Sequence, residues 1–149
     1  MKKHIYTITL FVGGFFISIF GLIMAVPIVN NHTAKNTAKV IEKIELPANT
    51  EYVENFWKAG KLVGNGNGMQ YLGGILVRSE LTIEELRAHY SQHLGQNDYD
   101  AEKQSDQNIN IIEHGNLSLQ TTIDNDNYYI IYLWGNDESV FSFLDIRGH

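Results

Sequence analysis

Residues 5–26 read IYTITLFVGGFFISIFGLIMAV, an uncharged run of 22 residues in which thirteen are Ile, Leu, Phe or Val. At about 1.5 Å per residue, a helix over this run is roughly 33 Å long, enough to cross a hydrocarbon core of about 30 Å. Insertion of the thirteen side chains contributes on the order of −4 to −8 kcal/mol. Pro27 and the polar residues after it predict the outer end of the span. The run therefore predicts a transmembrane helix within residues 1–29.

The same run distinguishes a permanent anchor from a cleaved signal peptide. A signal peptide needs only about 7 to 15 apolar residues and small residues at the cleavage site, whereas residues 23–25 begin with a bulky Ile.

The lysines on either side of the run indicate its orientation in the membrane. Lys2 and Lys3 adjoin the apolar run directly, while Lys35 lies further from it. We therefore favour an uncleaved single-pass protein of the cell membrane, with a cytoplasmic N-terminus and an extracytoplasmic C-terminal domain.

Small residues recur along one face of the expected helix, at spacings of four, three and four: Gly14, Ser18, Gly21 and Ala25. In lipid, small side chains let a second helix approach closely, because packing rather than hydrophobicity drives helix association there. Glycine is also frequent in membrane helices in general. Two alternatives stay open: a helix partner, which is a second copy or another protein, and an unpartnered anchor.

Charge and cysteine content exclude several classes of protein. The chain has 11 Lys and Arg against 17 Asp and Glu, a formal net charge of −6, whereas a nucleic-acid-binding protein needs a basic face. The absence of Cys excludes disulfides, thiolate metal sites and cysteine nucleophiles. Apolar residues make up 44% of the chain, which is enough for a folded core. We therefore expect the membrane, and not nucleic acid, as a partner.

Beyond the anchor we expect a polar tether over residues 30–40 and one extracytoplasmic domain over residues 41–149. The clearest element of this domain is a helix after Thr82, because Thr82 and Glu85 have the spacing of a capping box. Apolar side chains follow at spacings of three and four, and Gly95 is a typical helix-ending residue. Such a helix needs a flat apolar surface to pack against.

Antiparallel strands are the expected surface. Residues 51–63 and 69–79 are rich in aromatic or β-branched residues and flank a Gly/Asn run typical of a hairpin turn. After the helix and a polar loop at residues 96–108, four apolar segments alternate with Asn, Asp and Gly: 109–113, 117–123, 128–134 and 139–146. The sequence thus predicts an α+β fold, in which a transmembrane helix is followed by a β-hairpin, one main helix and a β-meander.

Several short motifs together resemble a family of small membrane-anchored extracytoplasmic proteins of Gram-positive bacteria, whose function is unknown. The motifs are the N-terminal anchor, ELP at residues 45–47, GNGNGMQY at residues 64–71 and the helix start that follows Ser79. The resemblance covers residues 45–90. It implies a location in the bacterial cell envelope, and it supplies no functional residues.

The glycine-rich run at residues 64–68 lacks the pattern of a nucleotide-binding loop. No Gly-Lys-Ser/Thr follows it, and a dinucleotide fingerprint would need glycine where Tyr71 stands. Its amide side chains suggest a second interpretation, a polar recognition edge for a glycan or peptide formed by Asn65, Asn67 and Gln70. A simple hairpin turn is the interpretation we favour.

His89 and His93 lie four residues apart on the expected helix, so their rings could share a divalent metal. A catalytic zinc needs a third ligand and a water, for which Glu113 and His114 are distant candidates. The His-Glu-x-x-His pattern is absent, and histidines at the boundary of an amphipathic helix are the interpretation of this spacing that we favour. We therefore assign no cofactor and no metal site, and keep His89 and His93 as the candidates should a metal be bound.

Three functions are compatible with these patterns. The leading hypothesis is a membrane-anchored protein whose exported, non-catalytic domain binds a protein or an envelope component, because no catalytic motif such as Gly-x-Ser-x-Gly is present. The second is a metal-dependent cell-envelope hydrolase that uses His89 and His93. The third is an accessory subunit of a membrane complex that acts through its transmembrane helix.

Overall fold

The computed structural model describes residues 2–95, 99–125, 127–135 and 139–149. Over these residues the chain is α+β, as predicted: a long apolar helix precedes a four-stranded antiparallel sheet packed against helices. The strand order in the sheet is β1-β2-β4-β3. The elements are α1 (Lys2–Glu42), β1 (Thr50–Gly60), β2 (Gln70–Ser79), α2 (Ile83–Leu94), β3 (Tyr99–Lys103), β4 (Tyr128–Gly135), α3 (Val140–Leu144) and the 3-10 helix η1 (Ile146–Gly148).

Helix α1 continues past Pro27 and includes residues 30–40, which were expected to form a polar tether. After Pro27 the buried residues recur at helical spacing, so that Asn30, Ala34 and Ile41 are fully buried along one face of the helix. Of the polar side chains that suggested a tether, those of His32, Lys35, Asn36 and Lys39 lie on the exposed faces of the same helix. This segment is therefore a helix packed on the domain rather than a tether.

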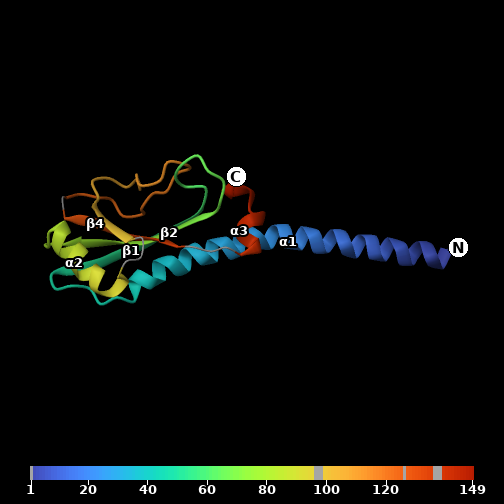
Figure 1. The fold of residues 1–149 in the computed structure, drawn as a ribbon, viewed down its shortest axis with the longest axis horizontal. Helices are drawn as coiled ribbons and strands as arrows, with labels where there is room; N and C mark the ends of the chain where they lie inside the picture. The colour runs from blue at the N-terminus through green and yellow to red at the C-terminus, as the bar shows by residue number, and fades with distance from the viewer. Residues whose placement is uncertain (1, 96–98, 126, 136–138) are drawn as a thin grey trace.

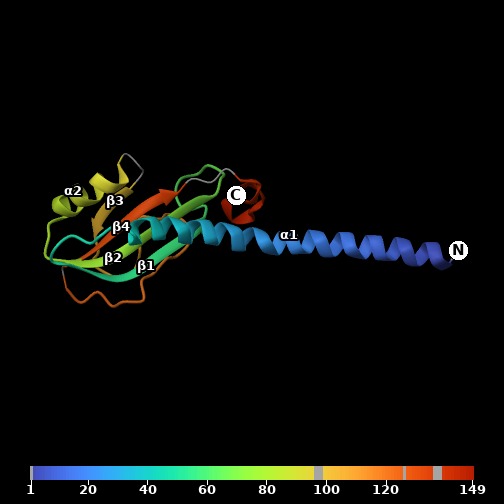
Figure 2. The same cartoon turned by 90° about the horizontal axis from the view of Figure 1, so that it is seen from below.

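Two apolar layers cover the sheet. On one face, alternate side chains of the strands pack against α1 and α2, in a cluster of Ile41, Ile75, Val77, Leu86, Tyr90, Leu94, Ala101, Ile131 and Leu133. On the other face, the intervening side chains pack against the chain between β3 and β4, including Ile109 and Leu119. Figure 1 shows α1 and α2 on one side of the sheet, and Figure 2 shows α1 in front of it.

The β1–β2 hairpin and helix α2, which short sequence motifs predicted, form as expected. Strands β1 and β2 are an antiparallel hairpin in which Thr50 lies opposite Ser79. At the start of α2, the Thr82 side chain accepts from the Glu85 amide and the Glu85 side chain accepts from the Thr82 amide, which completes the capping box. Gly95 ends the helix with a positive φ of 63°.

The predicted meander is only partly formed. Residues 128–134 are in a strand, as expected. Of residues 96–108, expected to be a loop, residues 96–98 lie outside the described part of the chain, and β3 follows directly after them and pairs with β4. Residues 139–146, expected to be the last strand, are mostly helical. The physical reason is capping: the Ser139 side chain accepts from a backbone amide of α3, and the Asp145 side chain accepts from one of η1.

Residues 109–113 and 117–123 were expected to be strands, and the structure assigns no strand to either. Within the described part of this connection, an isolated bridge joins Asn108 and Ser118. The Glu54 side chain accepts from the amides of residues 120 and 121, which ties the connection to β1. The apolar residues of these segments therefore reflect burial against the sheet and not strand pairing.

Candidate functional site

The N-terminal part of α1 projects from the domain as an apolar rod. Its large side chains between Leu10 and Met24 are exposed; Phe11 and Phe16, for example, are 77% and 64% exposed. The helical stretch Thr9–Glu42 is long and apolar enough, by length and composition, to cross a membrane. The buried face of α1 begins at Val26, where the rod meets the domain (Figure 1).

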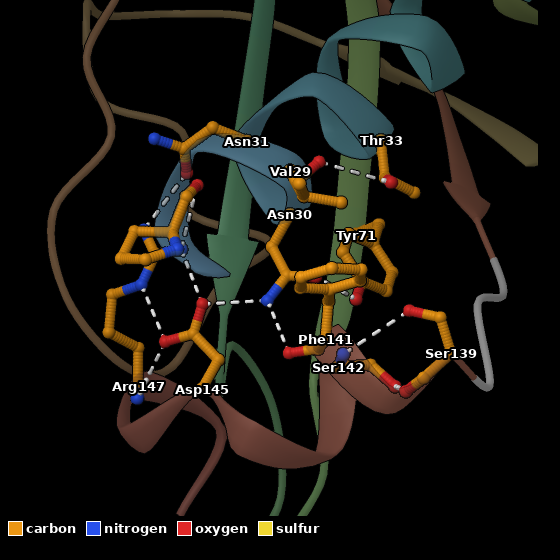
Figure 3. Close-up of polar contacts among 11 residues, drawn as sticks. Val29, Asn30, Asn31, Thr33, Tyr71, Ser139, Phe141, Ser142, Asp145 and Arg147 are labelled. Carbon is orange, nitrogen blue, oxygen red and sulfur yellow. Dashed lines mark hydrogen bonds and ion pairs between the residues drawn. The ribbon is translucent and has the colours of Figure 1, made fainter. Parts of the chain in front are cut away.

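A buried polar cluster joins α1 to β2 at this point (Figure 3). It also joins α1 to residues 139–149, which contain α3 and η1 and which we call the C-terminal segment. We call Asn30, Tyr71, Asp145 and Arg147 the junction cluster. The Asn30 side-chain nitrogen donates to the Phe141 carbonyl oxygen at 2.9 Å and to Asp145 Oδ2 at 2.8 Å. Its Oδ1 accepts from the Tyr71 hydroxyl at 2.9 Å. Both polar atoms of this fully buried side chain are therefore hydrogen-bonded.

Arg147 ties the C-terminal segment to α1. Its Nε and Nη2 donate to the two carboxylate oxygens of Asp145, at 2.9 and 2.6 Å. Its Nη1 donates to Asn31 Oδ1 at 2.9 Å, and its Nη2 also lies 3.3 Å from the Pro27 carbonyl oxygen. The planar guanidinium thus makes a bidentate ion pair and bonds α1 at the level where the rod begins.

The charges of the junction cluster stabilise one another. The Asp145 side chain is only 1% exposed and that of Arg147 is 36% exposed. Burial alone would raise the pKa of Asp145, but hydrogen bonds from Arg147 and Asn30 outweigh it and lower that pKa to about 2. The hydrogen bond to Asp145 raises the pKa of Arg147. Both groups therefore stay ionised at neutral pH.

This shift predicts an acid-sensitive contribution to stability. Because the pKa of Asp145 is lower in the folded chain than its ordinary 3.8, the carboxylate stabilises the fold above pH 4, and this stabilisation disappears as the pH falls toward 2. The full contribution is about 2 kcal/mol. We expect the stability difference between the wild type and Asp145→Asn, measured by thermal unfolding in detergent micelles, to shrink over that interval. A difference that stays constant down to pH 2 would contradict this assignment.

A polar cleft of about 500 Å³ opens at the end of the sheet where β1 begins and β2 ends. This end lies opposite the rod (Figure 1). Inside the cleft, Arg78 Nη2 bonds Glu51 Oε2 at 2.5 Å, and the Thr50 and Ser79 hydroxyls lie 2.6 Å apart. We call it the distal cleft; its lining residues are Asn49, Thr50, Glu51, Arg78, Ser79, Glu80, Asn125 and Asn127. It presents hydrogen-bond donors, acceptors and both signs of charge.

The candidate metal ligands are split between two places. His89 and His93 are neighbours on α2, with ring centroids 5.3 Å apart, and His89 Nε2 bonds a backbone carbonyl oxygen of the chain before β1 at 2.7 Å. Glu113 and His114 instead bond the backbone of Gly64, over the other face of the sheet. Among the residues that the structure describes, no group of three or more His, Cys, Asp or Glu is placed to hold a metal ion.

The residues of the expected recognition edge have different environments. Gln70 Oε1 accepts from the backbone amides of Leu62 and Val63, at 2.7 and 2.8 Å, and so holds the loop that follows β1. Asn65 and Asn67 are exposed in that loop. Gln70 therefore has a structural role, and the exposed part of the expected edge is the loop itself.

The small residues of the rod face away from the domain. Gly14, Ser18 and Gly21 are exposed, and Ala25 is half-buried. A Cβ added at Gly14 or Gly21 would meet nothing within 4 Å. With about 100° of rotation per residue, this face lies roughly opposite the buried face of α1 that carries Asn30. The domain therefore does not cover it.

Sequence patterns give no direct signal for the junction cluster, because its members are separated by up to 117 positions, from Asn30 to Arg147. One indirect signal exists. Asn30 lies four residues from both Val26 and Ala34, so it shares a helix face with small and apolar side chains. A polar side chain on a buried helix face needs hydrogen-bond partners elsewhere in the fold.

Comparisons with known proteins identify no relative of this chain. No family model matches it, and neither a curated protein nor a solved structure does. The resemblance to membrane-anchored proteins of Gram-positive bacteria stays a prediction.

Proposed function

We propose that this protein is a single-pass membrane protein whose α+β domain is a non-catalytic binding or accessory unit at the extracytoplasmic surface of the cell membrane. The observation that carries the proposal is the course of α1. Its apolar N-terminal part is exposed, and its C-terminal part belongs to the core of the domain. An exposed apolar rod of this length is unfavourable in water and favourable in a bilayer.

The way in which α1 enters the domain favours a fixed orientation over a mobile one. The helix is continuous from Lys2 to Glu42, and its C-terminal part packs on the sheet, where Ile41 belongs to the buried cluster. The junction cluster then fastens the helix to β2 and to the C-terminal segment. A domain joined in this way follows the orientation of its anchor and presents a fixed surface.

The distal cleft supports a binding role. It lies at the end of the domain away from the rod, so an anchored domain would expose it to the extracytoplasmic space (Figure 1). Its polar and charged lining suits a polar ligand, such as a glycan or a peptide. Lys2 and Lys3, next to the apolar run, favour the orientation in which the N-terminus is cytoplasmic.

Extraction of membranes with alkaline carbonate tests the anchor. We expect the full chain to stay in the membrane pellet and the Phe15→Arg/Phe16→Arg variant to be released, because each arginine at the centre of a span costs about 2.5–3.5 kcal/mol. The two costs are comparable to the whole insertion energy of the apolar run. His32→Arg/Asn36→Arg is the matched control, since these side chains are exposed on the part of α1 beside the domain. Release of the wild-type chain would contradict the proposal.

Thiol labelling in intact cells tests the orientation. The chain has no Cys, so a maleimide that cannot cross membranes labels only an introduced thiol. We expect Glu84→Cys, exposed on α2, to be labelled before lysis, and His4→Cys only after it. The reverse pattern would place the domain in the cytoplasm and would contradict the proposal.

A further inference from the structure

The C-terminal segment has its polar and apolar sides reversed relative to a surface helix of a soluble protein. In α3 and η1, Phe143 is 75% exposed and Ile146 is 86% exposed, while Asp145 is buried. The Ser139 and Ser142 side chains are half-buried and take part in the turn that caps α3. The exposed apolar residues of this segment, which we call the C-terminal apolar surface, are Val140, Phe143, Leu144 and Ile146.

This surface lies beside the rod. Leu144 and Ile146 line a mostly apolar groove of about 290 Å³ together with Leu22 and Ile23 of α1. The two α1 residues are themselves more than half exposed. Figure 1 shows α3 against α1 at the point where the helix leaves the domain. The exposed apolar surface of the rod is therefore continuous with the part of the C-terminal apolar surface that Leu144 and Ile146 form.

The position along α1 fixes the depth of this surface. Leu22 lies four residues before Val26, the end of the apolar run, which is roughly 6 Å along a helix axis. If the run fills the hydrocarbon core, residues beside Leu22 lie at its outer edge. Short apolar surfaces at this depth are stabilised by burial among the headgroups and upper acyl chains.

The junction cluster holds the C-terminal segment at this depth. Asp145 and Arg147 belong to the segment, and their hydrogen bonds to Asn30 and Asn31 attach it to α1. The polar side of the segment thus faces the cluster, while its apolar side chains point away from the domain core. Continuity with the rod favours lipid over a protein partner as the occupant, because the bilayer that receives Leu22 and Ile23 reaches their neighbours as well.

We propose that the C-terminal apolar surface inserts into the outer interface of the bilayer that α1 spans, an inference that rests on the proposed function. The domain then contacts the membrane at two places, the helix and this surface. Two contacts fix the tilt of the domain and hold the distal cleft away from the lipid.

Fluorescence quenching in vesicles of phosphatidylcholine and phosphatidylglycerol tests this inference on the full chain. Because the chain lacks Cys, an environment-sensitive dye can be attached at single positions: Phe143→Cys and Ile146→Cys on the surface, Ile17→Cys in the rod, and Glu84→Cys on α2 as the control. Lipids carry a nitroxide quencher either near the headgroup or near the bilayer centre. We expect the dyes at 143 and 146 to lose most of their fluorescence with the shallow quencher, the dye at 17 with the deep one, and the dye at 84 with neither.

The outcomes separate this inference from the proposed function. If the dye at 17 is quenched and those at 143 and 146 are not, the anchor holds and the C-terminal apolar surface does not touch lipid, which overturns the inference. A blue shift at 143 without quenching would assign the surface to a contact within the protein or with a second copy of this chain, and would overturn the inference too. If the dye at 17 is not quenched by either lipid, the proposed function fails and the inference fails with it.

Discussion

Replacement of Gly73 by alanine is expected to force α1 away from the sheet and to lower the free energy of unfolding by about 3 kcal/mol or more, at the upper end of the cost of overpacking. A Cβ at this position would lie 2.2 Å from the amide nitrogen of Ala38, 2.7 Å from the carbonyl carbon of Thr37 and 2.9 Å from the carbonyl oxygen of Ala34. All three are backbone atoms of α1, so no side-chain rotation relieves the contact. Glycine at this position therefore lets α1 lie directly on β2.

Two other glycines provide a graded comparison. A Cβ at Gly135 would lie 2.5 Å from Thr37 Oγ1, a side-chain atom that can move, so Gly135→Ala should cost less. Thr37→Ala in the same chain should recover part of that loss, as a double-mutant cycle would show. Gly66→Ala meets nothing within 4 Å and should change stability by less than about 0.5 kcal/mol.

Thermal unfolding of the purified full chains in detergent micelles, followed by circular dichroism, would rank the three variants. The order that we expect, from most to least destabilised, is Gly73→Ala, Gly135→Ala and Gly66→Ala. A Gly73→Ala chain as stable as Gly66→Ala would show that α1 does not rest on β2 in the way described.

The same contact explains why the second half of α1 was not predicted. Residues 30–40 are polar in composition, and Pro27 precedes them, so local signals favour a tether. The helix is favoured there because small residues, Ala34 and Ala38, fit against Gly73, which is more than 30 positions away in the chain. Local propensity cannot encode a close approach of this kind, whereas the capping box of α2 lies within four residues and was predicted.

For the strands, too, one property was predicted from local sequence and another was not. Residues 109–113 and 117–123 have the apolar content of strands, and their burial against the sheet was in that sense predicted. Strand pairing depends in addition on which sheet edge is available. In the structure β4 pairs with β2 on one side and with β3, from a segment of polar appearance, on the other. Apolar patterning thus predicts which residues are buried better than it predicts which backbones pair.

The candidate site was predicted only at its apolar end. The apolar rod follows from composition alone, because an uncharged run of 22 residues needs no knowledge of the rest of the fold. The junction cluster and the distal cleft assemble from distant segments, and their polar residues resemble ordinary loop residues in the sequence. His89 and His93 are a local pattern that the fold does not complete. Their spacing suggested a shared metal ion, but the structure places neither Glu113 nor His114 beside them as a third metal ligand.

Replacement of Asn30 by leucine is expected to be the second strongly destabilising change, with a loss of about 3–5 kcal/mol. The two side chains have the same number of heavy atoms in a similar branched shape, and leucine is the bulkier of the two, so the change removes hydrogen bonds without opening a cavity. The Tyr71 hydroxyl, the Phe141 carbonyl oxygen and Asp145 Oδ2 would each lose the hydrogen bond that Asn30 makes. A hydrogen bond between neutral groups contributes about 0.5–1.5 kcal/mol and one to a charged group about 1.5–3 kcal/mol, so the bond to Asp145 carries the largest share. Asp145 Oδ2 keeps its hydrogen bond from Arg147 Nη2 in the variant.

Asn36→Leu is the matched control, because Asn36 is exposed on the same helix and the substitution is chemically identical. It should change stability by less than about 0.5 kcal/mol in the same unfolding experiment. Tyr71→Phe should give an intermediate loss of about 1 kcal/mol, since it removes one neutral hydrogen bond of the cluster. If Asn30→Leu were no more destabilising than Asn36→Leu, the junction cluster would not hold the domain to its helix. The fixed orientation of the domain on this helix would then have to come from the packing of α1 on the sheet, at Gly73, Gly135 and the cluster that includes Ile41.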